Sequence, residues 1–256
     1  MLRVLLQLLR RDLKIFFRGY QSKLIDTLVL FITNIAVFGY LMPGEGLSSS
    51  YGSFLVVAAI GSFGLIEIVG KLGLFLSDLE GERSLSQVLI MPISSSFVLY
   101  YIAFFWALSS LLLAIVLFPC GKLLLWDQFD LYAISYGKFL LSFFLGNLFF
   151  GAFGLWLGSL IPSMSSLNTI WLRYIVPLWM FGAYFFSWST AYHTHPWVGI
   201  LLLCNPIVHI MESMRSSAFG AEGYLPFWPS IFAIVLFTGF CAYHGVCRLQ
   251  KRLDCL

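Results

Sequence analysis

Apolar segments long enough to cross a lipid bilayer recur along this chain, and they limit its fold more than any other feature. A helix rises about 1.5 Å per residue, so about 20 apolar residues cross a hydrocarbon core of about 30 Å. The expected spans are residues 24–42, 52–77, 97–118, 133–161, 172–189 and 227–247. Charged residues make up only 11% of the chain, against about a quarter in soluble domains. The sequence therefore predicts an all-α, polytopic membrane protein with six transmembrane helices in one domain over residues 1–256.

Residues 1–23 precede the first span and have the pattern of an interfacial helix. At about 100° per residue, most apolar residues from Leu2 to Tyr20 fall on one face, away from Arg10, Lys14 and Arg18. Such a helix lies in the headgroup plane with its apolar face toward the lipid. The alternative is a simple basic topology anchor. No cleavable signal peptide is expected, because a full-length span follows the basic N-terminus.

Basic residues are distributed unevenly about the expected spans. One side holds Arg3, Arg10, Arg11, Lys14, Arg18, Lys23, Arg83, Arg173, Arg248, Lys251 and Arg252. Only Lys122 and Arg215 fall on the other side. Since basic residues gather on the cytoplasmic side, we expect both termini in the cytoplasm and residues 190–227 on the outer side. Basic residues at span ends are a topology signal and not a nucleic-acid footprint.

Residues 190–227, between the last two spans, are expected to form a re-entrant hairpin on the outer face. Residues 197–204 are apolar, but they reach only about 12 Å as a helix and cannot cross the bilayer. Pro206 lacks a backbone N–H and disfavours helix at Asn205, so the break is expected there. Asn205 then caps a second helix over residues 207–219.

Glu212 and Arg215 lie on that second helix at i, i+3 and are expected to pair. Both charges fall on the outer side, so neither has to cross hydrocarbon. We expect the hairpin to cap the outer mouth of a conduit, with this pair fixing its pose. The alternative is an ordinary extracellular loop with no gating role.

The sequence lacks the motifs of catalysis and nucleotide binding. It contains no Gly-x-x-x-x-Gly-Lys-Ser/Thr run, no Gly-x-Ser-x-Gly elbow and no His-Glu-x-x-His pair. His193 and His195 alone are a weak metal signal, and the five cysteines are expected to be unpaired thiols. We expect no catalytic residue, metal or cofactor in this chain. Energy for active transport must then come from an ion gradient or another subunit.

Two charged residues fall inside the second expected span. Glu67 and Lys71 lie at i, i+4 with the acid N-terminal to the base, an arrangement that favours pairing. Charge at this depth is costly and should face protein or a water-filled path. The pair is either a gating element of the conduit or a structural ion pair between spans.

Aromatic residues recur at helical spacing on the fourth and fifth spans. The candidates for a conduit lining are Phe149, Phe153, Trp156, Trp179 and Tyr184. Sugars have apolar C–H faces that stack on aromatic rings, so a glycan conduit would use them; helix packing or lipid contact is the alternative. Gly151, Gly154 and Gly158 on the fourth span allow a close helix neighbour.

The polar segment 78–95 separates the second and third spans. Its pattern is carried by Glu80, Glu82, Arg83, Ser84, Leu85, Val88, Leu89 and Pro92. Leu85, Val88 and Leu89 form one face of a short helix that suits a groove on a soluble partner, and Pro92 ends it. A polar loop with a proline stop is the alternative. The segment resembles the cytoplasmic coupling segment of ABC-2 type permeases, although Arg83 and Ser86 stand where that family usually has Gly and Glu.

The hairpin carries a second resemblance to the same family. Asn205, Pro206, His209, Glu212 and Arg215 form an Asn-Pro-x-Val-His-x-x-Glu-x-x-Arg pattern. It is most like the branch that exports capsular polysaccharide, O-antigen and teichoic acid. With the six-span layout, the resemblance covers nearly the whole chain.

The resemblance implies a permease subunit of a bacterial inner (plasma) membrane that forms a conduit with a second copy of itself. Its other partners would be the lipid bilayer, a lipid-linked glycan cargo and two nucleotide-binding ATPase subunits that bind ATP and Mg²⁺. An ABC-2 exporter of a drug, haem or lipid remains an alternative. A gradient-driven secondary transporter would show inverted repeats, and an intramembrane enzyme would need a nucleophile–base pair within its spans.

Overall fold

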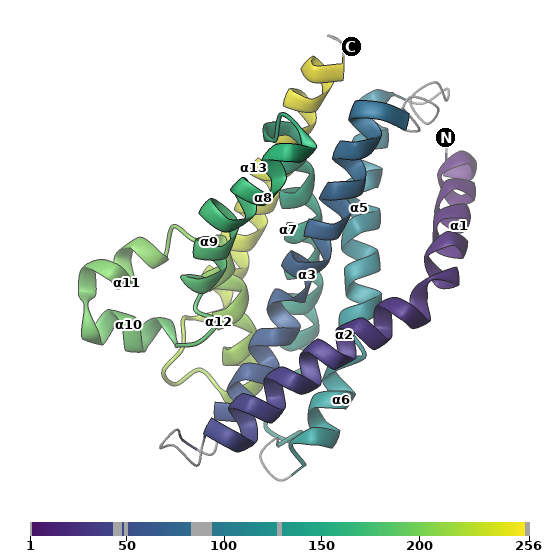
Figure 1. The fold of residues 1–256 in the computed structure, drawn as a ribbon. Helices are drawn as coiled ribbons and strands as arrows, with labels where there is room; N and C mark the ends of the chain where they lie inside the picture. The colour runs from purple at the N-terminus through teal and green to yellow at the C-terminus, as the bar shows by residue number, and fades with distance from the viewer. Residues whose placement is uncertain (1, 43–47, 49–50, 83–93, 127–129, 254–256) are drawn as a thin grey trace.

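The computed structural model describes residues 2–42, 48, 51–82, 94–126 and 130–253. In this part of the chain every regular element is a helix, and no strand occurs. The elements are α1 (Leu2–Arg18), α2 (Tyr20–Ile35), η1 (Ala36–Leu41), α3 (Tyr51–Ser77), η3 (Asp78–Glu82), α5 (Ser95–Ala114), α6 (Leu117–Leu124), α7 (Tyr136–Leu160), η4 (Met164–Ser166), α8 (Leu167–Ile170), η5 (Trp171–Ile175), α9 (Val176–Met180), α10 (Trp188–Thr194), α11 (Pro196–Leu202), α12 (Pro206–Phe219) and α13 (Phe227–Leu253). Helices α3, α5, α7 and α13 run along one another, and both termini lie at the same end of this bundle (Figure 1).

Among the described residues, five helical runs are long and apolar enough to cross a membrane: Tyr20–Leu41, Tyr51–Gly81, Ser95–Leu124, Tyr136–Leu160 and Phe227–Leu253. They match the predicted first, second, third, fourth and sixth spans, with ends that differ by a few residues. A bent pair, α11 and α12, makes a sixth candidate if it is counted as one span. The prediction of a polytopic, all-α membrane protein is confirmed.

The predicted fifth span, residues 172–189, is not among these long helices. The helical run that begins at Met164 ends at Met180, and a turn over residues 181–186 follows it. Two features shorten the run. Pro177 removes a backbone donor inside it, and Ala183 takes a positive φ of 61° that a helix does not contain. The chain is then turned into α10 rather than continuing across.

The predicted break at Asn205 and Pro206 is confirmed. Helix α11 ends at Leu202, α12 begins at Pro206, and the two helices bend by 97°. Asn205 caps α12, since its side-chain oxygen accepts a hydrogen bond from the backbone N–H of Ile207 at 3.0 Å. The 14 residues of α12 reach about 21 Å, which is less than the ~30 Å of a hydrocarbon core.

The N-terminal segment forms a helix as predicted, and Gly19 separates it from α2. Helix α1 runs beside α5 in Figure 1, and the Tyr101 hydroxyl of α5 donates a hydrogen bond to the Asp12 carboxylate at 2.7 Å. Leu6 and Phe17 are more than half exposed. The apolar surface left open suits contact with lipid, and the interfacial position of α1 stays a prediction.

Helix α7 is the centre of the bundle, because glycines let its neighbours approach. It packs against α13, α5, α3 and α12. A Cβ atom on Gly151 would overlap the carbonyl oxygen of Ala103 on α5, and one on Gly154 would lie 2.7 Å from the Ile68 side chain on α3. The predicted close approach at the glycines of this helix is confirmed.

We expect Gly151→Ala to destabilise the bundle and Gly137→Ala, a matched change on the same helix, to leave it intact. The added methyl at position 151 has no room between α5 and α7, whereas nothing lies within 4 Å of a Cβ at position 137. Overpacking of this kind costs about 1–3 kcal/mol. Thermal unfolding of the purified variants in detergent measures the difference. Equal melting temperatures would contradict the close packing of α5 on α7.

Candidate functional site

A fully buried ion pair lies at the base of the hairpin. Arg215 Nη1 and Glu212 Oε1 are 3.4 Å apart on α12, and both side chains have no exposed surface. The i, i+3 pairing predicted from the sequence is confirmed. Their complete burial was not predicted from the sequence. A buried ion pair is stable only when further hydrogen bonds satisfy both groups, so the partners of each side chain matter.

Both terminal nitrogens of Arg215 donate to the turn that follows α9, while its buried Nε has no hydrogen-bond partner among the described residues. Its Nη1 donates to the carbonyl oxygens of Ala183 at 2.5 Å and Phe186 at 3.1 Å, and its Nη2 donates to that of Tyr184 at 2.8 Å. The guanidinium carbon lies 3.6 Å from the ring centroid of Phe54 on α3. One side chain therefore joins α12, the turn and α3. It also holds Ala183 in a backbone conformation that is costly for a residue other than glycine.

Glu212 fixes the chain on the other side of the pair. Its two carboxylate oxygens accept hydrogen bonds from the backbone N–H groups of Trp188 and Leu225, each at 3.1 Å. Trp188 begins α10, and Leu225 lies just before α13. Burial raises the pKa of Tyr224, next to Leu225, while the charge of Arg215 opposes that rise. The pair thus anchors both ends of residues 188–225.

The other predicted hairpin residues make local contacts. Asn205 Nδ2 donates to the carbonyl oxygen of Leu178 at 2.7 Å, which ties the break to α9. A ring nitrogen of His209 lies 2.9 Å from the carbonyl oxygen of Leu203 and donates to it. Pro206 is the first residue of α12. Asn205, Pro206 and His209 determine the bend between α11 and α12. The Glu212–Arg215 pair then fixes where α12 lies, so all five predicted residues position the hairpin.

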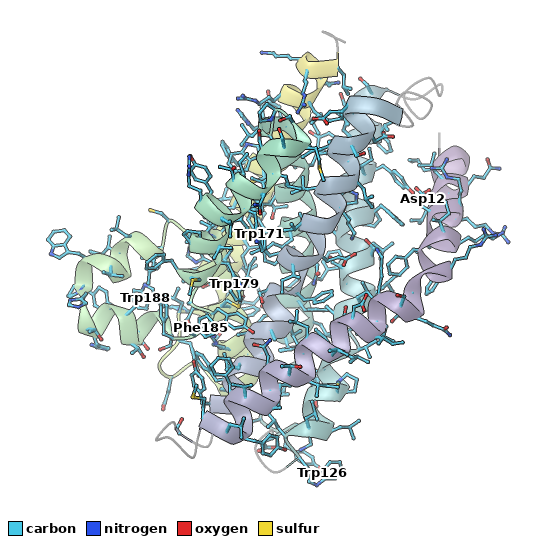
Figure 2. All side chains as sticks on the ribbon, viewed as in Figure 1. Asp12, Trp126, Trp171, Trp179, Phe185 and Trp188 are labelled. Atoms are coloured by element: carbon cyan, nitrogen blue, oxygen red, sulfur yellow. The ribbon has the colours of Figure 1, made fainter. Side chains whose placement is uncertain are left out.

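Helices α10 and α11 project from the bundle and form the α10–α11 arm (Figure 1). The indole N–H of Trp188 donates to the carbonyl oxygen of Gly199 at 2.8 Å and connects the two helices of this arm. The α10–α11 arm meets the bundle near Trp179, Phe185 and Trp188 (Figure 2), and the Trp179 and Phe185 ring centroids are 5.8 Å apart. The buried pair holds the base of the α10–α11 arm, and contacts between α10 and α11 hold the rest of it.

The predicted Glu67–Lys71 pair is also present, and it has a third member. Glu67 Oε1 lies 3.4 Å from Lys71 Nζ and 3.5 Å from Lys23 Nζ on α2. Lys71 also donates to the Trp106 carbonyl oxygen at 3.0 Å and to the Ser109 hydroxyl, both on α5. The cluster connects α2, α3 and α5. Lys23 was assigned from the sequence only to the positive-inside tally, since nothing in its spacing links it to Glu67.

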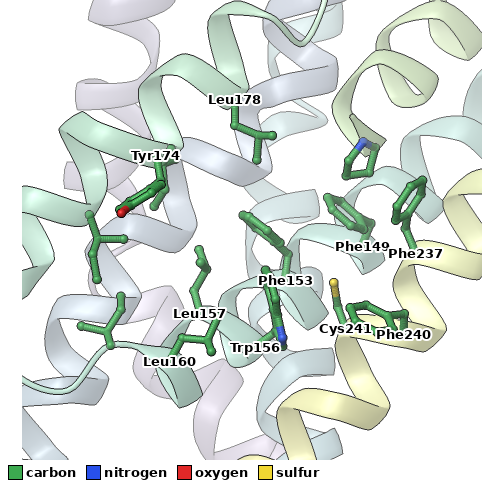
Figure 3. Close-up of a pocket in the computed structure, with 14 residues that line it drawn as sticks. Phe149, Phe153, Trp156, Leu157, Leu160, Tyr174, Leu178, Phe237, Phe240 and Cys241 are labelled. Atoms are coloured by element: carbon green, nitrogen blue, oxygen red, sulfur yellow. The ribbon is translucent and has the colours of Figure 1, made fainter. Parts of the chain in front are cut away.

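The aromatic residues proposed for the conduit fall into two groups. Phe149, Phe153 and Trp156 line one cavity of about 540 Å³ between α7, α13 and the run from α8 to α9 (Figure 3). The wall is almost wholly apolar, and the indole N–H of Trp156 is occupied by His244 Nδ1 at 2.9 Å. Trp179 and Tyr184 lie elsewhere and contact each other, with ring centroids 4.7 Å apart.

The coupling segment lies mostly outside the described residues. This holds for Arg83, Ser84, Leu85, Val88, Leu89 and Pro92, and Glu82 is described only as the end of η3. Glu80 is described, and its carboxylate accepts a hydrogen bond from the backbone N–H of Met164 at 2.7 Å. The end of α3 is therefore connected to the segment that follows α7, at the end of the bundle that holds the termini.

Comparison with known families decides which class of membrane protein this is. The family model for the ABC-2 type transporter matches residues 3–219, which include five of the six predicted spans and the buried pair. This chain belongs to the ABC-2 type transporter family. It is therefore a membrane permease component of an ABC transporter, a family that works with an ATPase partner and is not a catalytic family. No curated protein matches the chain.

The buried pair of this ABC-2 permease component predicts a specific stability defect. Arg215→Met leaves Glu212 buried without its counter-ion, a change that costs about 3–5 kcal/mol. Arg173→Met is the matched control, because Arg173 is exposed on η5. We expect a large fall in the melting temperature for the first variant and little change for the second. Similar melting temperatures would contradict the anchoring role of the pair.

The cluster of three charges makes a second prediction. Glu67 is the one acidic partner of Lys71 among the described residues, so Glu67→Gln removes it, whereas Lys71→Met leaves Glu67 with Lys23. We therefore expect Glu67→Gln to destabilise the protein more than Lys71→Met. The double variant should be less unstable than the sum by about 0.5–3 kcal/mol. Thermal unfolding of the four proteins measures this coupling, and strictly additive changes would show that the two residues do not interact.

Proposed function

We propose that two copies of this permease, with two separate nucleotide-binding ATPase subunits, export a lipid-linked polysaccharide across a bacterial inner membrane. ATP and Mg²⁺ bind in the ATPase subunits. Both termini and residues 78–95 lie in the cytoplasm in this proposal, and residues 190–227 lie outside. The observation that supports a conduit made of two copies is a group of exposed polar residues on one face of α2.

Ser22, Asp26 and Thr33 are all exposed, and they share one face of α2. At about 100° per residue they fall within an arc of about 40°, and the exposed Val29 lies at the edge of the same stripe. Helix α2 belongs to a candidate membrane span, and a carboxylate within a span faces protein or water rather than lipid. A second copy that covers this face, with a polar path between the two α2 helices, satisfies that requirement.

The proposed cargo rests on a resemblance of the hairpin. Its sequence resembles that of polysaccharide exporters at Asn205, Pro206, His209, Glu212 and Arg215, and these five residues position the hairpin. In the proposed cycle, closure of the ATPases pushes residues 82–92. The contact between Glu80 and Met164 passes that movement to the segment after α7. The helices then shift as bodies and open the outer mouth.

A second candidate is export of a lipid or an apolar drug. The cavity lined by Phe149, Phe153 and Trp156 supports it, because the wall offers a hydrocarbon chain apolar contact and offers a sugar almost no hydrogen-bond partners. The lipid tail of a lipid-linked glycan has the same chemistry. The cavity is therefore compatible with both candidates, and the polar face of α2 favours the one with a polar cargo.

We predict that deletion of this chain removes a polysaccharide from the cell surface while its lipid-linked form accumulates inside. Leu85→Asp should give the same export defect and detach the ATPase, because a charge then replaces an apolar contact residue. Co-purification of the ATPase and the melting temperature are measured together. Tyr132→Asp is the matched control, since Tyr132 is fully exposed next to the loop after α6.

Unchanged surface polysaccharide in the deletion strain would reject the cargo. Export and ATPase co-purification at wild-type levels in Leu85→Asp would reject the coupling assignment of residues 78–95.

A further inference from the structure

We propose that a cleft beside the buried ion pair is a sugar-binding subsite at the outer end of the conduit. The cleft has a volume of about 420 Å³ and lies between the start of α3, the turn at residues 185–187, the start of α10 and residues 222–224. This inference rests on the proposed function, since it names where that permease contacts the glycan part of its cargo.

Aromatic rings form one wall of the cleft. The rings of Tyr51 and Phe54 on α3 lie 5.5 Å apart and nearly parallel, at 17°, and Phe185 from the turn joins them. The apolar C–H faces of a pyranose ring pack on such surfaces. A purely polar ligand would gain little from this wall.

Hydrogen-bonding residues also line the cleft. They are Ser187, Ser189, Thr190 and the exposed Glu222. The Ser189 hydroxyl donates to the carbonyl oxygen of Gly223 at 2.6 Å and lies 3.0 Å from the Ser187 hydroxyl, which leaves one lone pair of Ser189 for a ligand hydroxyl. A carboxylate accepts hydrogen bonds from sugar hydroxyls without a proton of its own. Aromatic and hydroxyl groups in one cleft suit a polyol with an apolar face.

The charges of the site favour a neutral ligand. Arg215 is the nearest cation, and it already donates to Ala183, Tyr184 and Phe186 and pairs with Glu212. No lysine, arginine or histidine is among the described residues that line the cleft. Glu222 therefore repels an anion. The guanidinium that lies 3.6 Å from the Phe54 centroid disfavours a second cation on that ring.

Hydrogen bonds and ring contacts connect the cleft to neighbouring elements. The Tyr51 hydroxyl donates to the carbonyl oxygen of Phe185 at 2.8 Å, and Arg215 holds the carbonyl of Phe186. Phe38 of η1 lies 6.5 Å from the Tyr51 ring and 6.0 Å from the Phe185 ring. Because η1 continues α2, the aromatic wall of the cleft is in contact with the end of the first predicted span.

Photocrosslinking in exporting cells tests the subsite. The photoreactive residue p-benzoyl-phenylalanine is placed at position 186 or 224, both in the cleft, and at position 126 as the control. Trp126 is exposed at the end of the bundle opposite the termini (Figure 2). The chain is purified after irradiation, and covalently bound carbohydrate is detected by periodate oxidation and hydrazide labelling. Surface polysaccharide is measured in the same cells, so that only variants that still export are compared.

We expect several-fold more carbohydrate on the chain from the cleft positions than from position 126. Glu222→Gln should lower that yield several-fold. Asp130→Asn, an exposed carboxylate outside the cleft, should not lower it. Adducts that contain lipid or protein but no carbohydrate, or equal carbohydrate at position 126, would overturn the subsite.

Export that continues with no carbohydrate adduct at either cleft position would reject the subsite and leave the proposed function intact. Polysaccharide that reaches the surface without this chain would reject the proposed function itself.

Discussion

The position of the hairpin depends on the burial of Arg215. Removing two charges from water costs several kcal/mol per ion, and mutual attraction offsets this only when hydrogen bonds satisfy the remaining donors and acceptors. Here those bonds come from the backbone: the turn after α9 for Arg215, and Trp188 and the N–H of Leu225 for Glu212. The pair is therefore stable only when the turn, α10 and the chain before α13 are all in place. Two side chains on one short helix thus determine how the last part of the chain is arranged.

The features predicted correctly from the sequence are those set by local rules. Apolar runs of span length need lipid or a partner helix, and a proline cannot continue a helix, so the spans and the break at Pro206 follow from composition and backbone chemistry. Glycines on α7 predicted close packing because no other residue leaves room for a neighbouring backbone. Pairing at i, i+3 and i, i+4 follows from helix geometry, and both predicted pairs are present.

The features missed from the sequence depend on contacts between distant segments. The partners of Arg215 are carbonyl groups of a turn about thirty residues earlier, and a carbonyl has no side-chain signature. The short fifth helix depends on the positive φ of Ala183, which no rule assigns to alanine. Lys23 joins Glu67 only because α2 crosses α3 at that point. The aromatic residues were grouped by their sequence spacing. In the structure, Trp179 and Tyr184 contact each other near the turn after α9 and do not line the cavity that Phe149, Phe153 and Trp156 share.

Packing also distinguishes the helices at the centre of the bundle from α2. In the most apolar window of the run that contains α3, 72% of the residues are buried, against 17% in the run that contains α2. The glycines of α7 bring α3 and α5 to short range, with no room for an added Cβ at Gly151 or Gly154. Helix α2 contains no glycine and meets α3 at the Glu67 cluster, while η1, which continues α2, packs on the start of α3 through Phe38 and Tyr51. The glycines therefore let α3, α5 and α7 approach closely, whereas α2 is joined to α3 by side-chain contacts at its two ends.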